Sequence, residues 1–252
     1  MLRGMKSSRN SLPARTAEGV QQQAIMLVLG IDTCGPEGSV ALGRLAEGVV
    51  EILEQIELEG RSYSATLVAA VGDLLAHAGA QLRDVGAIVA VNGPGSFTGV
   101  RVGLSAVKGL AEAAGIPVVA VSRLEVLAWK ASRASSALDA HRNEVFLRVP
   151  GRDGEGIEML AGRSELLMTP PPAHIAVCDA SAVALLEIEW PQSKLLNVPA
   201  PTASDAMRLA VPRILAGKFV DLTLLDGHYL RRSDAEIFGG AAAGSVARAQ
   251  GA

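Results

Sequence analysis

The sequence of 252 residues contains few aromatic side chains and only two cysteines. Phe, Trp and Tyr together make up 3% of the chain, while hydrophobic residues as a whole make up 49%. A buried core must therefore consist mainly of Ala, Val, Leu and Ile. Cys34 and Cys178 lie far apart and form no CxxC pair, which excludes a disulfide framework and favours two reduced thiols. Because no run of 18 apolar residues occurs, we expect no membrane span and no membrane partner.

Charge and histidine spacing limit the possible chemistry further. The net charge is −3, and residues 1–25 carry four basic side chains and one acidic one, so the remainder carries −6. An acidic body does not predict a basic groove for nucleic acid. None of the four histidines lies three to five residues from another, so we predict no metal site, and we expect no cofactor.

The two ends of the chain differ from its body. Residues 1–25 are polar and lack the apolar segment of a secretory signal, so we expect a disordered tail or an over-extended start, and a cytoplasmic protein. Residues 239–252 are a low-complexity run of small residues that we expect to be a flexible tail.

Residues 26–133 alternate between strand and helix patterns and predict one lobe. Short apolar runs and amphipathic stretches predict strands over 27–32, 38–44, 49–58, 85–91 and 117–121, and helices over 62–80, 99–114 and 122–133. The last helix begins with a capping box at Ser122 and Glu125. The order βββαβαβα is typical of a ribonuclease-H-like unit, which is half of the actin-like ATPase fold, so we predict an α/β protein of that class.

Residues 134–238 predict a second, shortened copy of this lobe. The segment 138–149 repeats the pattern of 31–44, in which a strand ends in an aspartate and a turn leads to a second strand. Asp32 and Asp139 then occupy equivalent positions. Beyond this repeat we expect loops over 150–170, a strand over 174–178, and helices over 181–187 and 204–217, the last capped by Ser204.

The loop between the predicted strand 85–91 and the helix 99–114 is the most specific segment. Its sequence NGPGSFTGVR fits neither GxxxxGK[ST] nor GxGxxG, so composition favours a tight, capped turn over a phosphate site. Ser96 or Thr98 is expected to cap the helix. Beyond the loop, one face of the helix is apolar and the other consists of small residues, which predicts burial of both faces, against the sheet and against another helix.

The segment GPGSFTGVRVG (93–103) resembles the signature of the TsaB family, also called YeaZ. Four further segments agree in order: LGIDTCGPEGSVAL, PVVAVSRLEVLA, DAHRNEVF and GHYLRRSDAE. The resemblance covers about residues 27–236. It assigns the signature loop to Gly93, Pro94, Gly95, Ser96, Phe97, Thr98, Gly99 and Arg101.

The resemblance implies an actin-like fold and a role in making threonylcarbamoyladenosine beside the tRNA anticodon. In that system TsaB is the non-catalytic partner of its paralogue TsaD, which transfers the threonylcarbamoyl group, and TsaE is a small ATPase; tRNA is expected to be contacted indirectly. The implied TsaD interface lies on the first two helices. We assign it to Tyr63, Leu67, Ala70, Leu74, Val102, Ala106, Gly109 and Leu110. The chain departs from the family at Tyr63-Ser64-Ala65, where His-Ser-Glu is common.

Three alternatives remain open at this stage. An actin-like ATPase or phosphotransferase would use Asp32 and Asp139 beside magnesium, but no convincing adenosine loop is present. A metalloprotease would need paired histidines, which the spacing argues against. A homodimeric interaction module could use the same pair of helices. We predict no catalytic residues in this chain.

Overall fold

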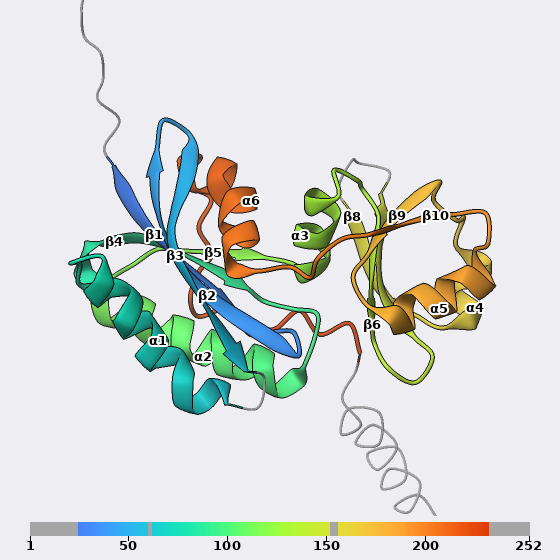
Figure 1. Ribbon diagram of the computed structural model, residues 1–252, viewed down its shortest axis with the longest axis horizontal. Helices are drawn as coiled ribbons and strands as arrows, with labels where there is room; N and C mark the ends of the chain where they lie inside the picture. Colours follow the sequence, from blue (N-terminus) through green and yellow to red (C-terminus); the bar gives the residue numbers. More distant parts are fainter. Residues whose placement is uncertain (1–24, 60–61, 152–155, 232–252) are drawn as a thin grey trace, which may run out of the picture.

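The computed structural model describes residues 25–59, 62–151 and 156–231, which form two lobes, each built on a five-stranded sheet (Figure 1). No helix in these ranges is long and apolar enough to cross a membrane. The predictions for residues 1–25 and 239–252 fall almost wholly outside the described residues.

The first sheet has the strand order β3-β2-β1-β4-β5. Its strands are β1 (Met26–Asp32), β2 (Glu37–Ala46), β3 (Val49–Glu59), β4 (Val85–Val91) and β5 (Val118–Val121). The first three strands form an antiparallel meander, and β4 and β5 continue the sheet in parallel with β1. This confirms the order of strands and helices along the chain that the sequence predicted.

The second sheet repeats the same topology, with the order β10-β9-β6-β7-β8. Its strands are β6 (Ser136–Asp139), β7 (Val145–Pro150), β8 (Gly156–Ala161), β9 (His174–Val177) and β10 (Lys194–Asn197). In this order β6 takes the place of β1, so Asp139 ends its strand as Asp32 ends β1. The actin-like arrangement of two related lobes is thereby established. The prediction of loops over 150–170 is wrong, because this segment contains β8 and a helix at Arg163–Met168.

Helices cover both faces of each sheet. They are α1 (Tyr63–His77), α2 (Phe97–Ala114), α3 (Arg123–Lys130), α4 (Arg163–Met168), α5 (Ala180–Glu189) and α6 (Ala203–Leu215), with a short 3₁₀ turn η1 (Leu82–Asp84). Helices α1 and α2 pack on one face of the first sheet and α6 on the other. Helices α4 and α5 pack beside the second sheet, and α3 covers its opposite face.

The last helix of each lobe therefore packs on the sheet of the other lobe. Helix α3 follows β5 in the chain but contacts β6, β7 and β9, whereas α6 follows β10 but contacts every strand of the first sheet. The sequence assigned α6 to the lobe spanning 134–238, and the structure places it in the core of the first lobe. Met207 of α6 lies against Gly30 and Gly43, so these two glycines leave the room that the helix needs.

The structure tests the helix caps that the sequence predicts. Ser96 caps α2 by accepting a hydrogen bond from the Gly99 amide, as predicted. Ser122 caps α3 through the Leu124 amide, but the predicted capping box is wrong, because the Glu125 carboxylate pairs with Arg213 instead. The prediction of Ser204 as the cap of the last helix is wrong: Thr202 is the cap, and it forms a capping box with Asp205.

Candidate functional site in the interlobe cleft

The loop after β1 forms the floor of a cleft between the two lobes. Asp32 lies at the end of β1, and its Oδ1 accepts a hydrogen bond from the Cys34 amide at 2.8 Å. The Thr33 hydroxyl donates to the Gly99 carbonyl at 2.7 Å, and the Tyr63 hydroxyl donates to the Gly35 carbonyl at 2.9 Å. Burial raises the pKa of Tyr63 to about 12, so this phenol remains a donor at neutral pH. The loop is thus tied to both α1 and α2.

The glycines of the signature loop allow this close packing. A Cβ atom at Gly95 would overlap the Cys34 carbonyl, and one at Gly99 would overlap the Thr33 carbonyl. A Cβ atom at Gly103 would overlap Thr33 Oγ1. Helix α2 therefore lies directly on the β1–β2 loop, and the segment acts as a capped structural turn.

Asp32 and Arg123 form a buried ion pair on this floor. Arg123 Nε lies 3.8 Å from Asp32 Oδ2, and the side chains are 7% and 1% exposed. Within the part of the chain that the structure describes, both atoms lack a hydrogen-bond partner. Burial raises the pKa of Asp32 above its usual value, an effect that the Arg123 charge and the Cys34 amide only partly offset.

The cleft has a volume of about 970 Å³ and is lined by both lobes. The first lobe contributes the loops that hold Cys34 and Pro94, together with Arg123. The second lobe contributes Asp139 with the loop after it, and Phe146. Burial raises the pKa of Cys34 well above its usual value, so the group is a neutral thiol rather than a nucleophilic thiolate.

The segment 227–231 crosses the mouth of the cleft and contacts both lobes. On the first lobe, the His228 amide donates to the Asn92 carbonyl at 2.7 Å, and the Tyr229 ring packs on Phe97 with centroids 5.3 Å apart. On the second lobe, Arg231 hydrogen-bonds the Ala140 carbonyl at 2.9 Å and pairs with Glu144.

Glu158 joins this segment to three other elements. Its carboxylate accepts hydrogen bonds from Ser122 at 2.6 Å and Arg148 at 2.7 Å, and it lies 2.9 Å from His228 Nε2. Burial alone would raise the pKa of Glu158, but the contacts to His228, Ser122 and Arg148 together outweigh it and lower the pKa. The acidic group therefore links β8 to the start of α3, to β7 and to the segment 227–231.

The loop that follows Asp139 has an unusual backbone. His141, Arg142 and Asn143 all have left-handed φ angles, of 61°, 56° and 59°. Each such residue costs about 1–2 kcal/mol relative to the right-handed region. Asp139 anchors the loop by accepting from the His141 amide at 2.8 Å and pairing with His141 Nδ1 at 2.9 Å. Backbone strain of this kind clusters at active sites, ligand-binding loops and switch regions.

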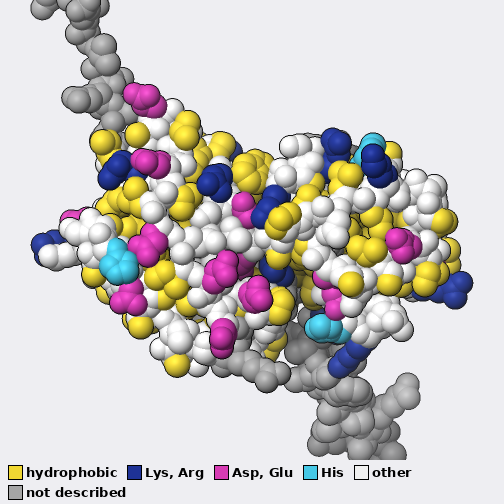
Figure 2. Space-filling view, viewed as in Figure 1, with side chains coloured by type: hydrophobic (Ala, Val, Ile, Leu, Met, Phe, Trp, Pro, Cys, Tyr) yellow, Lys and Arg dark blue, Asp and Glu magenta, His cyan; other side chains and the backbone are white. Residues whose placement is uncertain are grey.

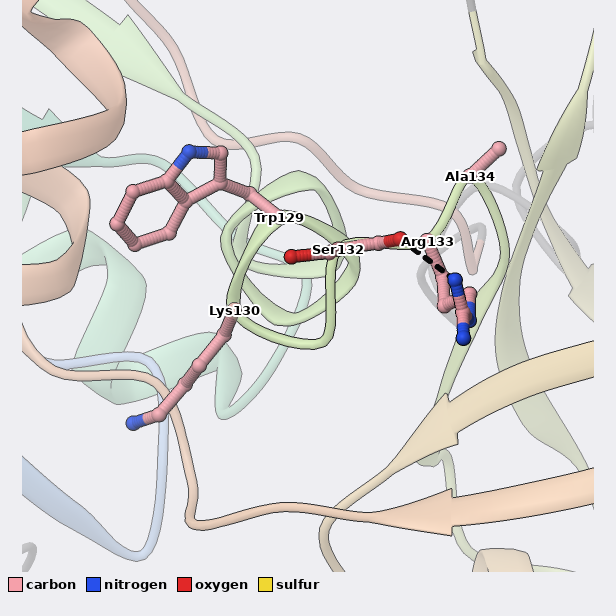
Figure 3. A pocket seen from close by; sticks show the side chains of 5 residues that line it. All are labelled: Trp129, Lys130, Ser132, Arg133 and Ala134. Carbon is pink, nitrogen blue, oxygen red and sulfur yellow. Dashed lines mark hydrogen bonds between the residues drawn. The ribbon is translucent and has the colours of Figure 1, made fainter.

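A second hollow lies at the end of α3 and is a weaker candidate. Its lining side chains, from Trp129 to Ala134, point away from one another rather than toward a common centre (Figure 3). Lys130 is already bound to Asp205 at 2.6 Å and to the Ala200 carbonyl at 2.9 Å. Within the ranges that the structure describes, no cluster of three His, Cys, Asp or Glu side chains could hold a metal ion.

Comparison with known proteins supplies the family. The model of the family TsaD, tRNA N6-adenosine threonylcarbamoyltransferase, matches residues 51–165. An Escherichia coli K12 protein named tRNA threonylcarbamoyladenosine biosynthesis protein TsaB is 32% identical over 226 residues, covering 82% of this chain and 96% of that protein. The chain belongs to the TsaB family.

Two further relatives agree with the TsaB assignment. The solved structure of YeaZ from Pseudomonas aeruginosa superposes with a TM-score of 0.65 at 30% identity, covering 81% of this chain and 100% of that one. A Bacillus subtilis TsaB protein is 38% identical over 125 residues, covering 48% of this chain and 53% of that protein. The local match to the TsaD model and the full-length match to TsaB indicate that the two families are related.

The structure divides the TsaB interface residues predicted from the sequence into two groups. Tyr63, Leu67, Ala70 and Leu74 are at most 6% exposed and pack in the core. The prediction is wrong for these four residues, because the apolar stripe of α1 faces the sheet rather than the solvent. Val102, Ala106 and Leu110 are half-buried, and Gly109 is exposed.

Small and apolar residues form one exposed stripe on each of the two helices, beside polar and charged ones such as Asp73 and Glu112, and we name the two stripes the α1–α2 face. It comprises Ala65, Val68, Ala69, Gly72 and Ala76 of α1, and Val102, Ala106, Gly109, Leu110 and Ala113 of α2. In Figure 2, the lower left of the molecule, where α1 lies in Figure 1, shows mostly white and yellow surface interspersed with carboxylates.

Sequence reasoning did not single out Arg123 or Glu158. Arg123 directly follows the predicted cap Ser122, and Glu158 lies within a segment predicted as loop. Neither position indicates a role for its side chain. His228, Tyr229 and Arg231 belong to the segment GHYLRR, which was noted for its resemblance to the family but given no role.

Proposed function

We propose that this chain is a non-catalytic accessory protein in the synthesis of threonylcarbamoyladenosine in tRNA, beside the anticodon. It acts by binding a TsaD-type transferase, with a TsaE-type ATPase joining the complex and tRNA contacted indirectly. The name of the E. coli relative, which aligns over 96% of its length, supports the pathway. The partner is inferred from the α1–α2 face.

The observation that carries this proposal is the pair of unexplained glycines on that face. Beyond its own helix backbone and chain neighbours, a Cβ atom at Gly72 or Gly109 would meet no atom of the described residues within 4 Å, so the packing of these residues does not need glycine there. Glycine inside a helix costs about 0.5–1 kcal/mol relative to alanine. A helix from a partner gains from glycine because its backbone can approach closely.

The TsaD-type partner is favoured by family relationship. The TsaD model matches residues 51–165, a range that includes both α1 and α2. A related protein with the same helix pair would offer a face of similar shape, and the two pairs would pack about an approximate two-fold axis. A second copy of this chain would offer the same geometry, so a homodimer is the competing state.

The carboxylates of the cleft favour the non-catalytic reading over an ATPase. Arg123 lies beside Asp32 and already supplies the positive charge that a metal ion would bring. Asp139 is held by the amide and the ring of His141. A phosphotransferase needs carboxylates that are open to magnesium and its water ligands.

The proposal is tested by capture of the chain on an immobilised TsaD-type transferase from the same source. Gly109→Trp and Ala106→Trp place a large side chain on the α1–α2 face, and each should weaken binding at least tenfold. Ala184 lies exposed on α5 in the other lobe, so Ala184→Trp adds the same bulk away from the face and should bind normally. Equal capture of all three variants would rule out this face as the interface.

A further inference from the structure

Arg123 is a buried cation with a nitrogen that has no hydrogen-bond acceptor among the described residues. A guanidinium carries five N–H donors, and buried arginines are nearly always hydrogen-bonded. The Arg123 side chain is 7% exposed, and its buried Nε has no acceptor among the described residues. Asp32 lies close enough for attraction but, at 3.8 Å, not for a hydrogen bond.

Apart from Glu59 and Arg142, which are exposed, the other charged side chains that line the cleft have partners. Asp179 accepts from the Ala182 amide at 2.7 Å and the Asp139 amide at 3.0 Å, and Asp139 pairs with His141. His228 and Arg231 pair with Glu158 and Glu144. Among the described residues that line the cleft, Arg123 is therefore the buried charge that lacks a hydrogen-bonded partner.

The shape and lining of the cleft suit a small ligand with a charged end and an apolar body. Its volume of about 970 Å³ lies within the range of ligand pockets, about 300–1,000 Å³. Leu138, Phe146, Val100 and Phe97 contribute apolar lining. Arg142, which the left-handed loop holds at the cleft, adds an exposed positive charge.

We propose that the interlobe cleft binds a small molecule through a phosphate or carboxylate group that accepts hydrogen bonds from the Arg123 guanidinium. The oxyanion would supply hydrogen-bond acceptors to an arginine that lines the cleft and lacks an acceptor for its Nε. This site is independent of the α1–α2 face, so either proposal can fail without the other.

Asp32 does not prevent anion binding. Its pKa is raised by burial, which makes the protonated, neutral form of the carboxyl more accessible than in water. Gly35 packs directly against Arg123 Nη2, and a Cβ atom there would displace it. The loop after β1 is therefore shaped around the guanidinium and holds it facing the cleft.

The test is titration of the full-length protein with inorganic phosphate and, separately, with acetate, at constant ionic strength set with chloride. Binding is followed by the ¹⁵N–¹H resonance of Arg123 Nε and by isothermal calorimetry. Saturable displacement of that resonance by phosphate alone indicates a phosphorylated ligand, and displacement by acetate alone indicates a carboxylate ligand. Displacement by both indicates a general oxyanion site.

Two variants separate the site from nonspecific charge effects. Arg123→Met should weaken binding of the active probe at least tenfold, whereas Arg83→Met, which removes an exposed charge from η1, should leave it unchanged. If Arg123→Met does not fold, the resonance measurement on the wild-type chain still tests the proposal. No displacement by either probe, or equal binding by a folded Arg123→Met chain, would overturn the proposal.

Discussion

At the scale of single residues, the signature loop is explained by steric contact rather than by ligand chemistry. Gly99 and Gly103 allow α2 to lie on the β1–β2 loop, where Thr33 donates its hydroxyl hydrogen to the Gly99 carbonyl. The absence of a side chain at these positions is thus part of the packing of the core.

This packing predicts a coupled pair of substitutions. Gly103→Ala should lower the free energy of unfolding by about 1–3 kcal/mol, because the new methyl group overlaps Thr33 Oγ1. Thr33→Ala removes that oxygen and one hydrogen bond, at a cost of about 1 kcal/mol. The double variant should be more stable than the sum of the single effects predicts, as measured by urea unfolding of all four proteins. Strict additivity would contradict the contact.

Single residues were also where prediction from sequence was weakest. Ser204 and Thr202 are both good caps by type, and only the structure shows that Asp205 pairs with Thr202. The apolar residues of α1 could face a partner or the sheet, since periodicity marks a face without saying what covers it. Arg123 carries no local sign of its burial, because Asp32 lies 91 positions away.

At the scale of elements, the α1–α2 face predicts a conflict between stability and binding. Gly72→Ala and Gly109→Ala should each raise the free energy of unfolding by about 0.5–1 kcal/mol, because alanine is the better helix former and the space is open. Both should weaken binding of the TsaD-type partner, since the added methyl group keeps the partner helix away.

Chemical unfolding and partner affinity measured on the same preparations test this conflict. Ala184→Gly on α5 is the matched control and should lower stability without changing affinity. A gain in stability with unchanged affinity would show that the two glycines serve no interface.

The elements themselves were predicted well where the pattern was long and poorly where it was short. The five strands and three helices of the first lobe have strong apolar runs or amphipathic stripes, and all eight are present. In the second lobe, β8, α4 and β10 were missed, because they span only four to six residues and lie beside turn-forming sequence. Strand β8 forms by pairing with β7, strand β10 by pairing with β9, and helix α4 packs against β8. These elements therefore depend on tertiary contacts rather than on local sequence preference.

At the scale of the whole molecule, the lobes are joined by exchanged helices and by the segment 227–231. The packing of α6 on the first sheet could not be read from its sequence, since all five partner strands lie more than 80 residues earlier. Glu158 adds a polar connection, because one carboxylate binds the cap of α3, Arg148 of β7 and His228 of the segment 227–231.

Glu158 makes part of this connection dependent on pH. A group whose pKa is lowered by folding stabilises the fold at pH values above its usual pKa of 4.5, and that contribution is lost as the pH falls through the lowered value. Glu158→Gln should therefore be less stable than wild type at pH 7, and the difference should shrink at pH 3.5. Urea unfolding at both values measures it, and an equal difference at both would contradict the assigned role. The pKa of Asp32 is raised, so its contribution to stability changes with pH in the opposite direction. This contribution is the same in both proteins and cancels when their free energies of unfolding are compared.

The most direct test of the account is the rate of threonylcarbamoyladenosine formation in tRNA by a reconstituted system. The TsaD-type and TsaE-type proteins, threonylcarbamoyl-adenylate and tRNA are combined with this chain, without it, or with its Gly109→Trp variant. We predict that modification is fast only with the wild-type chain and falls to background in the other two reactions. Modification at the full rate without the chain would contradict the claim that it is a required partner.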